Sequence, residues 1–518
     1  MAGNVAQQVN AVAERASAAG GAAASQGGLV AGLGLWDSTM IVVGSMIGSG
    51  IYIVSADISR QVRSPALLLT VWLVSGVMTM IGALSYGELA AAMPTAGGQY
   101  IYLRESLGPI WGFLYGWTLL LVIQTATIAA VGIAFSKFAG VFVPWFSSAS
   151  WLWKMGTYGP FHFWFGNLGP YNVGLNAQNL LAIVSILLLT LINTRGLRVG
   201  AIVQNIFTVA KTGALAGLVL IGLMAGRETS RMTNLGNFWG SGGLHFYTVG
   251  DVLVPIGTMA LVGVAMVGAL FSSDAWNNIT FLAAEVKEPK RNLPAALALG
   301  TIIVCALYLL ANIAYLNVLP LDGVQSGVDS LERGIKYAAE DRVGTAVAGM
   351  ILGNKGALLM ALAIMVSTFG CNNGLILAGA RVYYAMARDG LFFRSVGRLN
   401  RFHVPGTALV VQGVWASLLC LSGTYGQLLD FLIFAVLVFY ILTIAGLIVL
   451  RFRRPEMERP YRAFGYPVLP VIYLVMAIFI EVQLLRYKPE FTWPGLIIVV
   501  LGVPVYWVWR AVERQPAK

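Results

Sequence analysis

Apolar runs long enough to cross a membrane fill most of this 518-residue chain and restrict what it can fold into. A spanning helix needs about 20 mostly apolar residues, and in lipid every backbone polar group must find a partner within the protein. The runs are continuous rather than alternating, which predicts helices and an all-α integral membrane fold. We expect twelve transmembrane helices, at residues 36–60, 65–91, 107–136, 176–194, 199–226, 252–284, 293–318, 356–386, 406–427, 429–450, 464–484 and 491–510.

Charge is scarce and unevenly placed. Only 11% of the residues are charged, whereas a soluble domain carries about 25%. The net charge of +11 comes from short basic clusters between apolar runs, which favours loops beside a lipid bilayer and no nucleic-acid partner. Twenty Lys and Arg residues fall on one side and 12 on the other. This bias predicts a multi-pass protein of the plasma (inner) membrane with both termini in the cytoplasm.

Neither end of the chain and none of its reactive side chains suggests catalysis. Residues 1–33 are rich in Ala, Gly, Ser and Gln, which predicts a disordered cytoplasmic tail without a signal peptide. Residues 511–518 form the expected cytoplasmic C-terminal tail. The three cysteines lie in apolar runs and the three histidines are isolated. We therefore expect no metal, no cofactor and no enzymatic activity.

Two of the expected spans are interrupted. The first contains three glycines within 43–50, and the sixth carries one carboxylate and two amides within 271–278. Five spans separate the two breaks, so residues 36–226 and 252–450 form two similar units that must be inverted relative to each other. Residues 464–510 then supply two accessory spans. Matched broken helices in inverted halves indicate a transporter site, although glycines alone can also serve close helix packing.

A broken helix can bind both ends of an amino acid. The new N-terminus at Gly48, Ser49 and Gly50 offers free N–H groups and a positive dipole end to a carboxylate. The carbonyls just before each break are expected to point into the same cavity and to suit an ammonium group. A site with both properties describes an amino acid substrate.

Asp274 is the most informative acidic residue, because an unpaired carboxylate in a span is costly. It is expected to lie near the amino group of the substrate or to form hydrogen bonds in the cavity, to cap the second half of the sixth span, or to do both. Phe271 either closes over the substrate as a gate or packs as an ordinary aromatic residue. One of Asn277 and Asn278 is expected to face the substrate or the tenth span, and the other to satisfy backbone groups. Glu88 is expected to be mainly structural.

Lys211 is the one basic residue in the core of a predicted span. It lies near the middle of the fifth span, too deep to reach an interface. A fixed ammonium there can replace a bound sodium ion and brace the first span against the eighth. We expect it to bond to carbonyls around Gly44 and near Ser367 or Thr368. The alternative is a proton site with a pKa lowered by burial.

Three segments resemble the amino acid–polyamine–organocation superfamily: GSMIGSGIY, ELAAAMPTAGGQYIYLRESLGP and DAWNNITFLAAEVKEPKRNLP. FTVAKTGALAGLVL in the fifth span and FGCNNG in the eighth resemble its L-type amino acid transporter branch. The resemblance implies a LeuT-type fold of 5+5 inverted repeats with helices 1 and 6 broken, and sodium-independent amino acid exchange. It implies a substrate site made by Met46, Ile47, Gly48, Ser49, Gly50, Phe271, Ser272, Asp274, Asn277, Ile123, Gln124, Phe369 and Asn373, with Lys211 at the sodium position.

Two departures from the family pattern matter. Animal members that pair with a glycoprotein carry a cysteine between spans three and four, but residues 137–175 have none, so no disulfide-linked heavy chain is expected. Ala275 stands where many relatives have glycine, which puts the backbone of the second break in doubt.

The preferred function is sodium-independent exchange of neutral L-amino acids by alternating access. The alternatives are a proton-coupled or uniport carrier of cationic amino acids or polyamines and, more distantly, a channel or an amino acid sensor.

Overall fold

The structure is a computed structural model that describes residues 29–163, 166–168, 171–240, 245–249, 252–421 and 425–513. Residues 1–28 of the expected N-terminal tail and 514–518 of the expected C-terminal tail lie outside the described residues.

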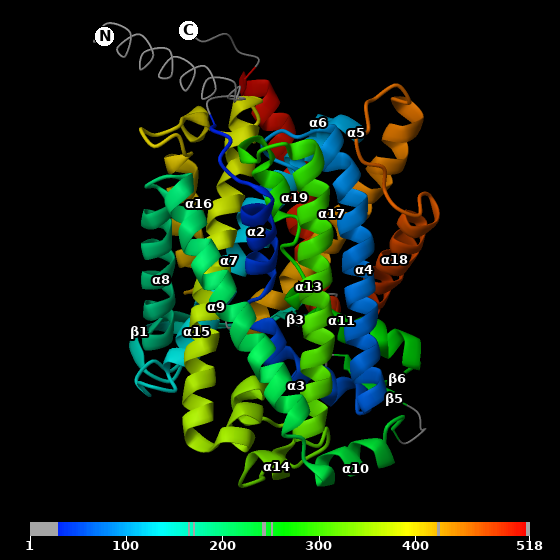
Figure 1. The fold of residues 1–518 in the computed structure, drawn as a ribbon. Helices are drawn as coiled ribbons and strands as arrows, with labels where there is room; N and C mark the ends of the chain where they lie inside the picture. Colours follow the sequence, from blue (N-terminus) through cyan, green and yellow to red (C-terminus); the bar gives the residue numbers. More distant parts are fainter. Residues whose placement is uncertain are drawn as a thin grey trace, which may run out of the picture.

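Long helices side by side dominate the described part of the chain (Figure 1). They are α2 (Leu35–Met46), α3 (Gly50–Val62), α4 (Pro65–Ala92), α5 (Gln99–Ser106), α6 (Pro109–Thr118), α7 (Gln124–Ala139), α8 (Ala177–Asn193), α9 (Leu197–Met224), α10 (Glu228–Gly236), α11 (Thr258–Ser272), α12 (Asn278–Phe281), α13 (Pro289–Val318), α14 (Ser330–Arg333), α15 (Val343–Arg388), α16 (Gly406–Leu419), α17 (Tyr425–Arg453), α18 (Val468–Tyr487) and α19 (Pro489–Glu513). A π-helical turn, η2 (Leu119–Ile123), joins α6 to α7, and the 3-10 turns are η3 (Ala283–Glu285), η4 (Ala339–Asp341) and η5 (Arg394–Gly397).

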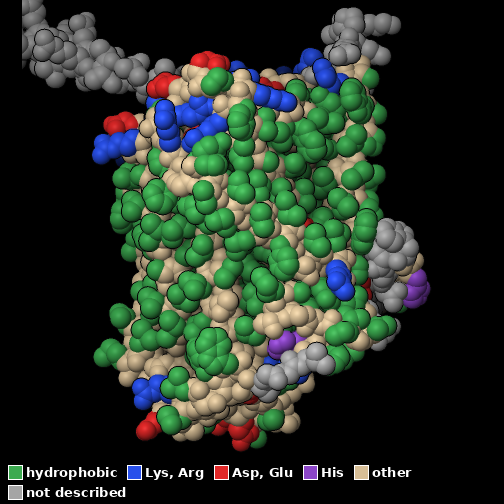
Figure 2. Space-filling view, turned by 90° about the vertical axis from the view of Figure 1, so that its right-hand side faces the viewer, with side chains coloured by type: hydrophobic (Ala, Val, Ile, Leu, Met, Phe, Trp, Pro, Cys, Tyr) green, Lys and Arg blue, Asp and Glu red, His purple; other side chains and the backbone are tan. Residues whose placement is uncertain are grey.

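Among the described residues, nine helical segments are long and apolar enough to cross a membrane. Three further apolar helices, α8, α11 and α16, are shorter and coincide with the fourth, sixth and ninth predicted spans. The side of the molecule in Figure 2 is largely hydrophobic along its height, with Lys and Arg gathered at the end where the chain termini lie. The protein is thus a multi-pass membrane protein.

Three small hairpins correct the prediction of an all-α chain. They are formed by β1 (Trp151–Tyr158) with β4 (Tyr171–Asn176), β2 (Phe161–Phe163) with β3 (Gly166–Leu168), and β5 (His245–Val249) with β6 (Val252–Ile256). The sixth span was predicted to begin at residue 252, but α11 begins only at Thr258. Pro255 explains the difference, because proline and the residue before it resist helical geometry. Branched and aromatic side chains around it favour a strand.

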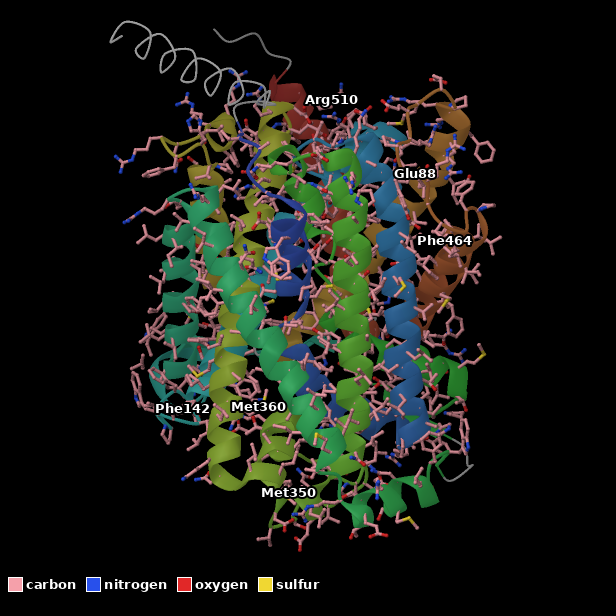
Figure 3. The ribbon with its side chains drawn as sticks, in the orientation of Figure 1. Glu88, Phe142, Met350, Met360, Phe464 and Arg510 are labelled. Carbon is pink, nitrogen blue, oxygen red and sulfur yellow. The ribbon has the colours of Figure 1, made fainter. Side chains whose placement is uncertain are left out.

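Helices far apart in the sequence pack against one another at the centre of the bundle. α13 packs on α4, α2 and α9, and α15 packs on α9 and α7. α15 bends at Gly353, whose φ of 67° is not helical, so its straight part begins close to the predicted residue 356. Figure 3 places Glu88 and Arg510 toward one end of the bundle and Phe142 and Met350 toward the other.

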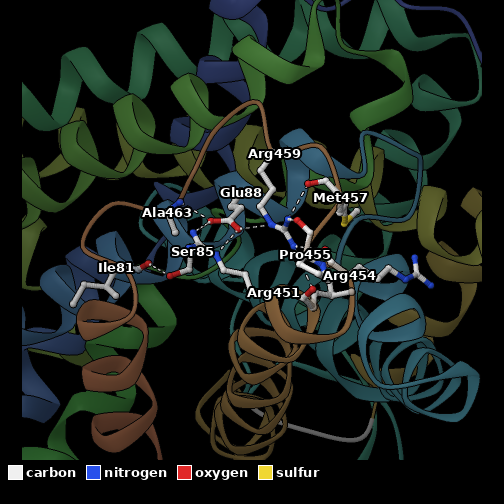
Figure 4. Close-up of polar contacts among 10 residues, drawn as sticks. Ile81, Ser85, Glu88, Arg451, Arg454, Pro455, Met457, Arg459 and Ala463 are labelled. Atoms are coloured by element: carbon white, nitrogen blue, oxygen red, sulfur yellow. Dashed lines mark hydrogen bonds and ion pairs between the residues drawn. The ribbon is translucent and has the colours of Figure 1, made fainter.

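A buried carboxylate fixes the loop between α17 and α18 onto α4 (Figure 4). Glu88 is 1% exposed and accepts two hydrogen bonds from Arg451, at 2.9 and 2.5 Å, and one from the Ala463 N–H at 2.6 Å. The Arg459 guanidinium lies 3.3 Å away. The guanidinium of Arg451 also stacks on Tyr466. This arrangement confirms a structural role for Glu88.

We expect Glu88→Ala to lower the thermal stability markedly, because it leaves two arginines and one backbone N–H without their acceptor. Breaking a buried ion pair costs about 3–5 kcal/mol. The melting temperature of the purified protein in detergent measures the effect. Glu458→Ala is the matched control, because Glu458 also pairs with a cation, Lys290, but is largely exposed. Equal melting temperatures for the two variants would contradict the role of Glu88.

Candidate functional site

The first predicted break lies between α2 and α3. α2 ends at Met46, Ile47 is extended with φ −73° and ψ 96°, and α3 begins at Gly50. The opening turn of a helix has N–H groups without helical partners, and the helix dipole is positive there. The start of α3 is therefore suited to a carboxylate.

The second predicted break lies between α11 and α12. α11 ends at Ser272, and α12 begins at Asn278. Between them Ala275 has φ 65°, a left-handed conformation that costs a residue with a Cβ about 1–2 kcal/mol. Glycine would adopt it without strain. Asn277 is the N-cap of α12, so the alternative in which Asp274 caps this helix is wrong.

The two breaks touch each other. A Cβ at Gly50 would overlap the Ser272 hydroxyl and would lie 2.7 Å from the Ser272 Cβ and 3.0 Å from its Cα. The Tyr308 hydroxyl on α13 lies 2.9 Å from the Met46 carbonyl oxygen and 3.1 Å from that of Ser272. Its single proton is shared between the last carbonyls of the two broken helices. Tyr308 thus joins the ends of α2 and α11.

The carbonyls around the first break have donors within the protein. The Lys211 ammonium on α9 is fully buried and donates to the carbonyl oxygens of Gly44, of Ile47 at 2.8 Å and of Ser367 at 3.3 Å. The predicted contacts near Gly44 and with Ser367 are confirmed. The Ser367 hydroxyl on α15 also donates to Ile47 and Gly48. The carbonyls expected to be free for an ammonium group are therefore already hydrogen-bonded.

A small cavity of about 20 Å³, room for about one water molecule, lies beside the second break. Four residues of the predicted site line it: Ile123, Gln124, Asp274 and Asn277. The other lining residues are Gln99, Tyr115, Leu119, Thr127, Ala275, Asn278, Phe281, Leu375, Val436 and Tyr440. The predicted residues Met46, Ile47, Gly48, Ser49, Gly50, Phe271 and Ser272 are not among the lining residues. The first break instead reaches the second break through the contact of Gly50 with Ser272.

Polar contacts hold the second break onto α17 and α5. The Tyr440 hydroxyl on α17 donates to the Asp274 carboxylate at 2.5 Å. The Asn277 amide donates to Gln99 at 2.9 Å, and the Gln99 amide donates to Thr443 on α17 at 3.0 Å. Asn277 therefore lies toward α17, the tenth predicted span, through Gln99. Asp274 is the one carboxylate among the residues described as lining this cavity.

Two predicted pocket residues on α15 point elsewhere. Phe369 packs between Phe135 and Phe207, with ring centroids 5.8 and 5.3 Å away. The Asn373 amide accepts from Asn193 and donates to Gln204, so it holds α15 against α8 and α9. Neither side chain lines the cavity, because each lies on a face of α15 that packs on neighbouring helices.

Sequence reasoning did not single out Tyr308, Gln99 or Tyr440. Tyr308 and Tyr440 stand in uninterrupted apolar runs, where a tyrosine gives no positional signal. The π-helical turn η2, which ends at Ile123 beside the cavity, also had no sequence marker, although such turns occur often at functional sites. In the described part of the chain, no group of three His, Cys, Asp or Glu residues could hold a metal ion.

We expect Tyr308→Phe to slow transport about tenfold while the protein still folds. The lost hydroxyl leaves two buried carbonyls with one partner fewer, and a buried hydrogen bond contributes about 1 kcal/mol. Initial uptake rates in proteoliposomes measure the effect. Tyr52→Phe is the matched control, since Tyr52 is equally buried and its hydroxyl has no hydrogen-bond partner in the described part of the chain. A Tyr308→Phe rate equal to that of the control would rule out the bridge.

A helical membrane bundle in which two interrupted helices meet, with a small polar cavity beside one of the breaks, is typical of membrane transport proteins. The chain belongs to the amino acid permease family, whose model matches residues 33–507.

Named relatives cover almost the whole chain. It is 29% identical over 482 residues to the b(0,+)-type amino acid transporter 1 of Homo sapiens, covering 90% of this chain and 85% of the relative. It is 30% identical over 508 residues to the large neutral amino acids transporter small subunit 2 of Mus musculus, covering 97% and 85%. It is 28% identical over 483 residues to the serine/threonine exchanger SteT of Bacillus subtilis (strain 168), covering 93% and 97%. These relatives are named as transporters and an exchanger, not as enzymes.

Proposed function

We propose that this protein is a secondary transporter that exchanges neutral L-amino acids, without sodium, by alternating access. The observation that carries the proposal is the meeting of two broken helices, through Gly50, Ser272 and Tyr308, beside a cavity that contains the carboxylate of Asp274. The N-terminal turn of α3 and the carboxylate of Asp274 together supply the two polarities that a zwitterion needs. The named relatives all act on amino acids.

We propose twelve spans arranged as a LeuT-type 5+5 inverted repeat, with units at 36–226 and 252–450 and accessory spans at 464–510. The pattern of packing supports this arrangement. Counterparts in the two units contact each other: α3 with α11, α4 with α13, α7 with α15, and α8 with α16. A two-fold relation between the units would bring such counterparts together across one axis.

The substrate is proposed to bridge the two breaks. Its carboxylate meets the start of α3 at Gly48, Ser49 and Gly50, and its amino group lies on the side of Asp274. The side chain is proposed to enter the cavity beside Ile123 and Gln124, which has to widen to receive it. Met46, Ile47, Ser272 and Asn277 complete the proposed site, and Phe271 is the proposed gate. Phe369 and Asn373 do not line the cavity, and we propose that they hold α15 against its neighbouring helices behind the site.

Sodium independence is assigned to Lys211. Its ammonium bonds to the carbonyls of Gly44, Ile47 and Ser367, which join α2 to α15 across α9. A cation at this place supplies the charge that an ion would otherwise bring to the unwound backbone.

The membrane setting follows from the charge bias. We propose a plasma (inner) membrane location with both termini in the cytoplasm, since most basic loops lie at the end of the bundle that carries them. No disulfide-linked heavy chain is proposed, because the free cysteines Cys305, Cys371 and Cys420 belong to α13, α15 and the end of α16.

A carrier of cationic amino acids or polyamines is the second candidate, favoured by the carboxylate of Asp274 in the cavity. A competition panel of leucine, serine, arginine and putrescine separates the two. Putrescine has no carboxylate, so strong competition by putrescine would remove the role proposed for the start of α3.

Exchange is tested in liposomes loaded with labelled amino acid. We expect release only when unlabelled amino acid is present outside, at the same rate with and without sodium and a pH gradient. Equal release into plain buffer would overturn exchange and favour uniport. Release that needs sodium would overturn the role given to Lys211.

A further inference from the structure

A second and larger cavity lies where the described chain begins, at the end of the bundle that carries both termini. Its volume is about 660 Å³. Its walls come from the segment before α2, the turn between α8 and α9, the residues after α12 and the loop before α16. It shares no lining residue with the cavity beside the second break.

Positive charge is in excess in this second cavity. Arg195, Arg198 and Lys287 line it, and within the described part of the chain none of these side chains has an ion pair or a hydrogen bond. Of the two acids that line it, Glu285 is neutralised by Arg381 through two bonds of 2.9 and 3.0 Å. Only Asp37 remains to offset three cations.

Hydrogen bonds between distant segments give the cavity its form. The Lys287 N–H donates to the Leu33 carbonyl at 2.8 Å, and the Gly32 N–H donates to the Glu285 carbonyl at 2.9 Å. The Asn400 amide donates to the Thr194 carbonyl at 2.8 Å. These bonds join the segment before α2 to the residues after α12, and the loop before α16 to the turn between α8 and α9, so all four walls are held by hydrogen bonds.

An apolar track leaves the mouth of the cavity along α9. Ile202 lines the cavity and is 51% exposed, and Ile206 and Val209 follow on the same face at 63% and 56% exposed. Residues four and seven positions apart lie on one face of a helix. In a bilayer this track faces acyl chains, whereas a soluble anion would make no use of it.

We propose that this second cavity binds the phosphate-bearing headgroup of an anionic membrane lipid, with an acyl chain along Ile202, Ile206 and Val209. Two guanidinium groups and an ammonium match a phosphate diester. The cytoplasmic leaflet, where the proposed orientation puts the cavity, is the one rich in anionic lipid. This lipid site shares no lining residue with the cavity of the proposed amino acid site, so a negative result for one proposal would not contradict the other.

Lipid titration of the purified full-length protein in detergent, followed by native mass spectrometry, tests the proposal. Phosphatidylglycerol and phosphatidylcholine are the probes. The combined variant Arg195→Ala, Arg198→Ala and Lys287→Ala should bind phosphatidylglycerol at least tenfold more weakly and phosphatidylcholine unchanged. The control variant Arg394→Ala, Arg398→Ala and Arg462→Ala removes three exposed cations outside the cavity and should bind both lipids as the wild type does.

Two results would overturn the lipid site. One is wild-type affinity of the cavity variant for phosphatidylglycerol. The other is displacement of the lipid by glycerol 3-phosphate as efficiently as by phosphatidylglycerol itself, which would identify a soluble anion as the ligand. The single variants each remove one charge from an exposed side chain, and we expect severalfold weaker binding in each, so the test does not depend on the triple variant folding.

Discussion

Gly50→Ala should reduce amino acid exchange at least tenfold. The added methyl group would overlap the Ser272 hydroxyl and would come within 3.0 Å of backbone on α11. The two breaks would have to move apart, and overpacking of this kind costs about 1–3 kcal/mol. Counterflow of labelled amino acid in proteoliposomes measures the loss, and substrate-induced thermal shift shows whether binding is lost with it.

Two further variants make the Gly50 test specific. Gly213→Ala on α9 is the matched control, because a Cβ there meets nothing within 4 Å, and it should exchange at the wild-type rate. Ser272→Gly in the Gly50→Ala background removes the overlapping atoms and should restore part of the activity. If Gly50→Ala exchanges as fast as Gly213→Ala, the two breaks do not need to meet.

Lys211→Ala should lower exchange at least 100-fold while the protein still folds. The carbonyls of Gly44 and Ile47 lose a charged donor, and a buried group left unpaired costs about 1–3 kcal/mol. Lys211 connects α2, α9 and α15, and in the proposed transport cycle these helices have to move relative to one another. Uptake rates normalised to the amount of monodisperse protein measure it.

Two further variants separate the effect of the Lys211 charge on exchange from the effect of its side-chain volume. Lys211→Met keeps most of the side-chain volume without the charge and should be as inactive as Lys211→Ala. Lys355→Ala, at an exposed position of α15, should be fully active. Normal exchange by Lys211→Met would show that the ammonium has no part in transport.

The sequence predicted the helices and both breaks because their causes are local. Long apolar runs set the spans, and glycines or buried polar residues mark where a helix cannot continue. The Lys211 contacts could also be predicted, since one ammonium at mid-span must find acceptors, and the first break offers them. The hairpin at 245–256 was missed because the apolar residues of β6 merge with those of α11.

The sequence could not predict in which direction the side chains of the site residues point. Residues 369 and 373 are one turn apart on α15, and only the rotation of that helix decides which neighbour they face. The structure directs Phe369 to Phe207 and Asn373 to Gln204 on α9. Tyr308 was missed for a related reason: its importance comes from two carbonyls that are distant in the sequence and free only because two helices break.

The buried ammonium of Lys211 has an energetic consequence for the cell. A sodium ion at this place would enter and leave in every cycle and would couple amino acid movement to the sodium gradient. A lysine is covalently attached, so the same charge returns to its starting position and extracts no work. Under the proposed one-for-one exchange, a substrate can accumulate on one side of the membrane only by the factor with which its counter-substrate is concentrated on that same side. The concentration gradient of one amino acid would therefore be limited by the gradient of the amino acid exchanged for it.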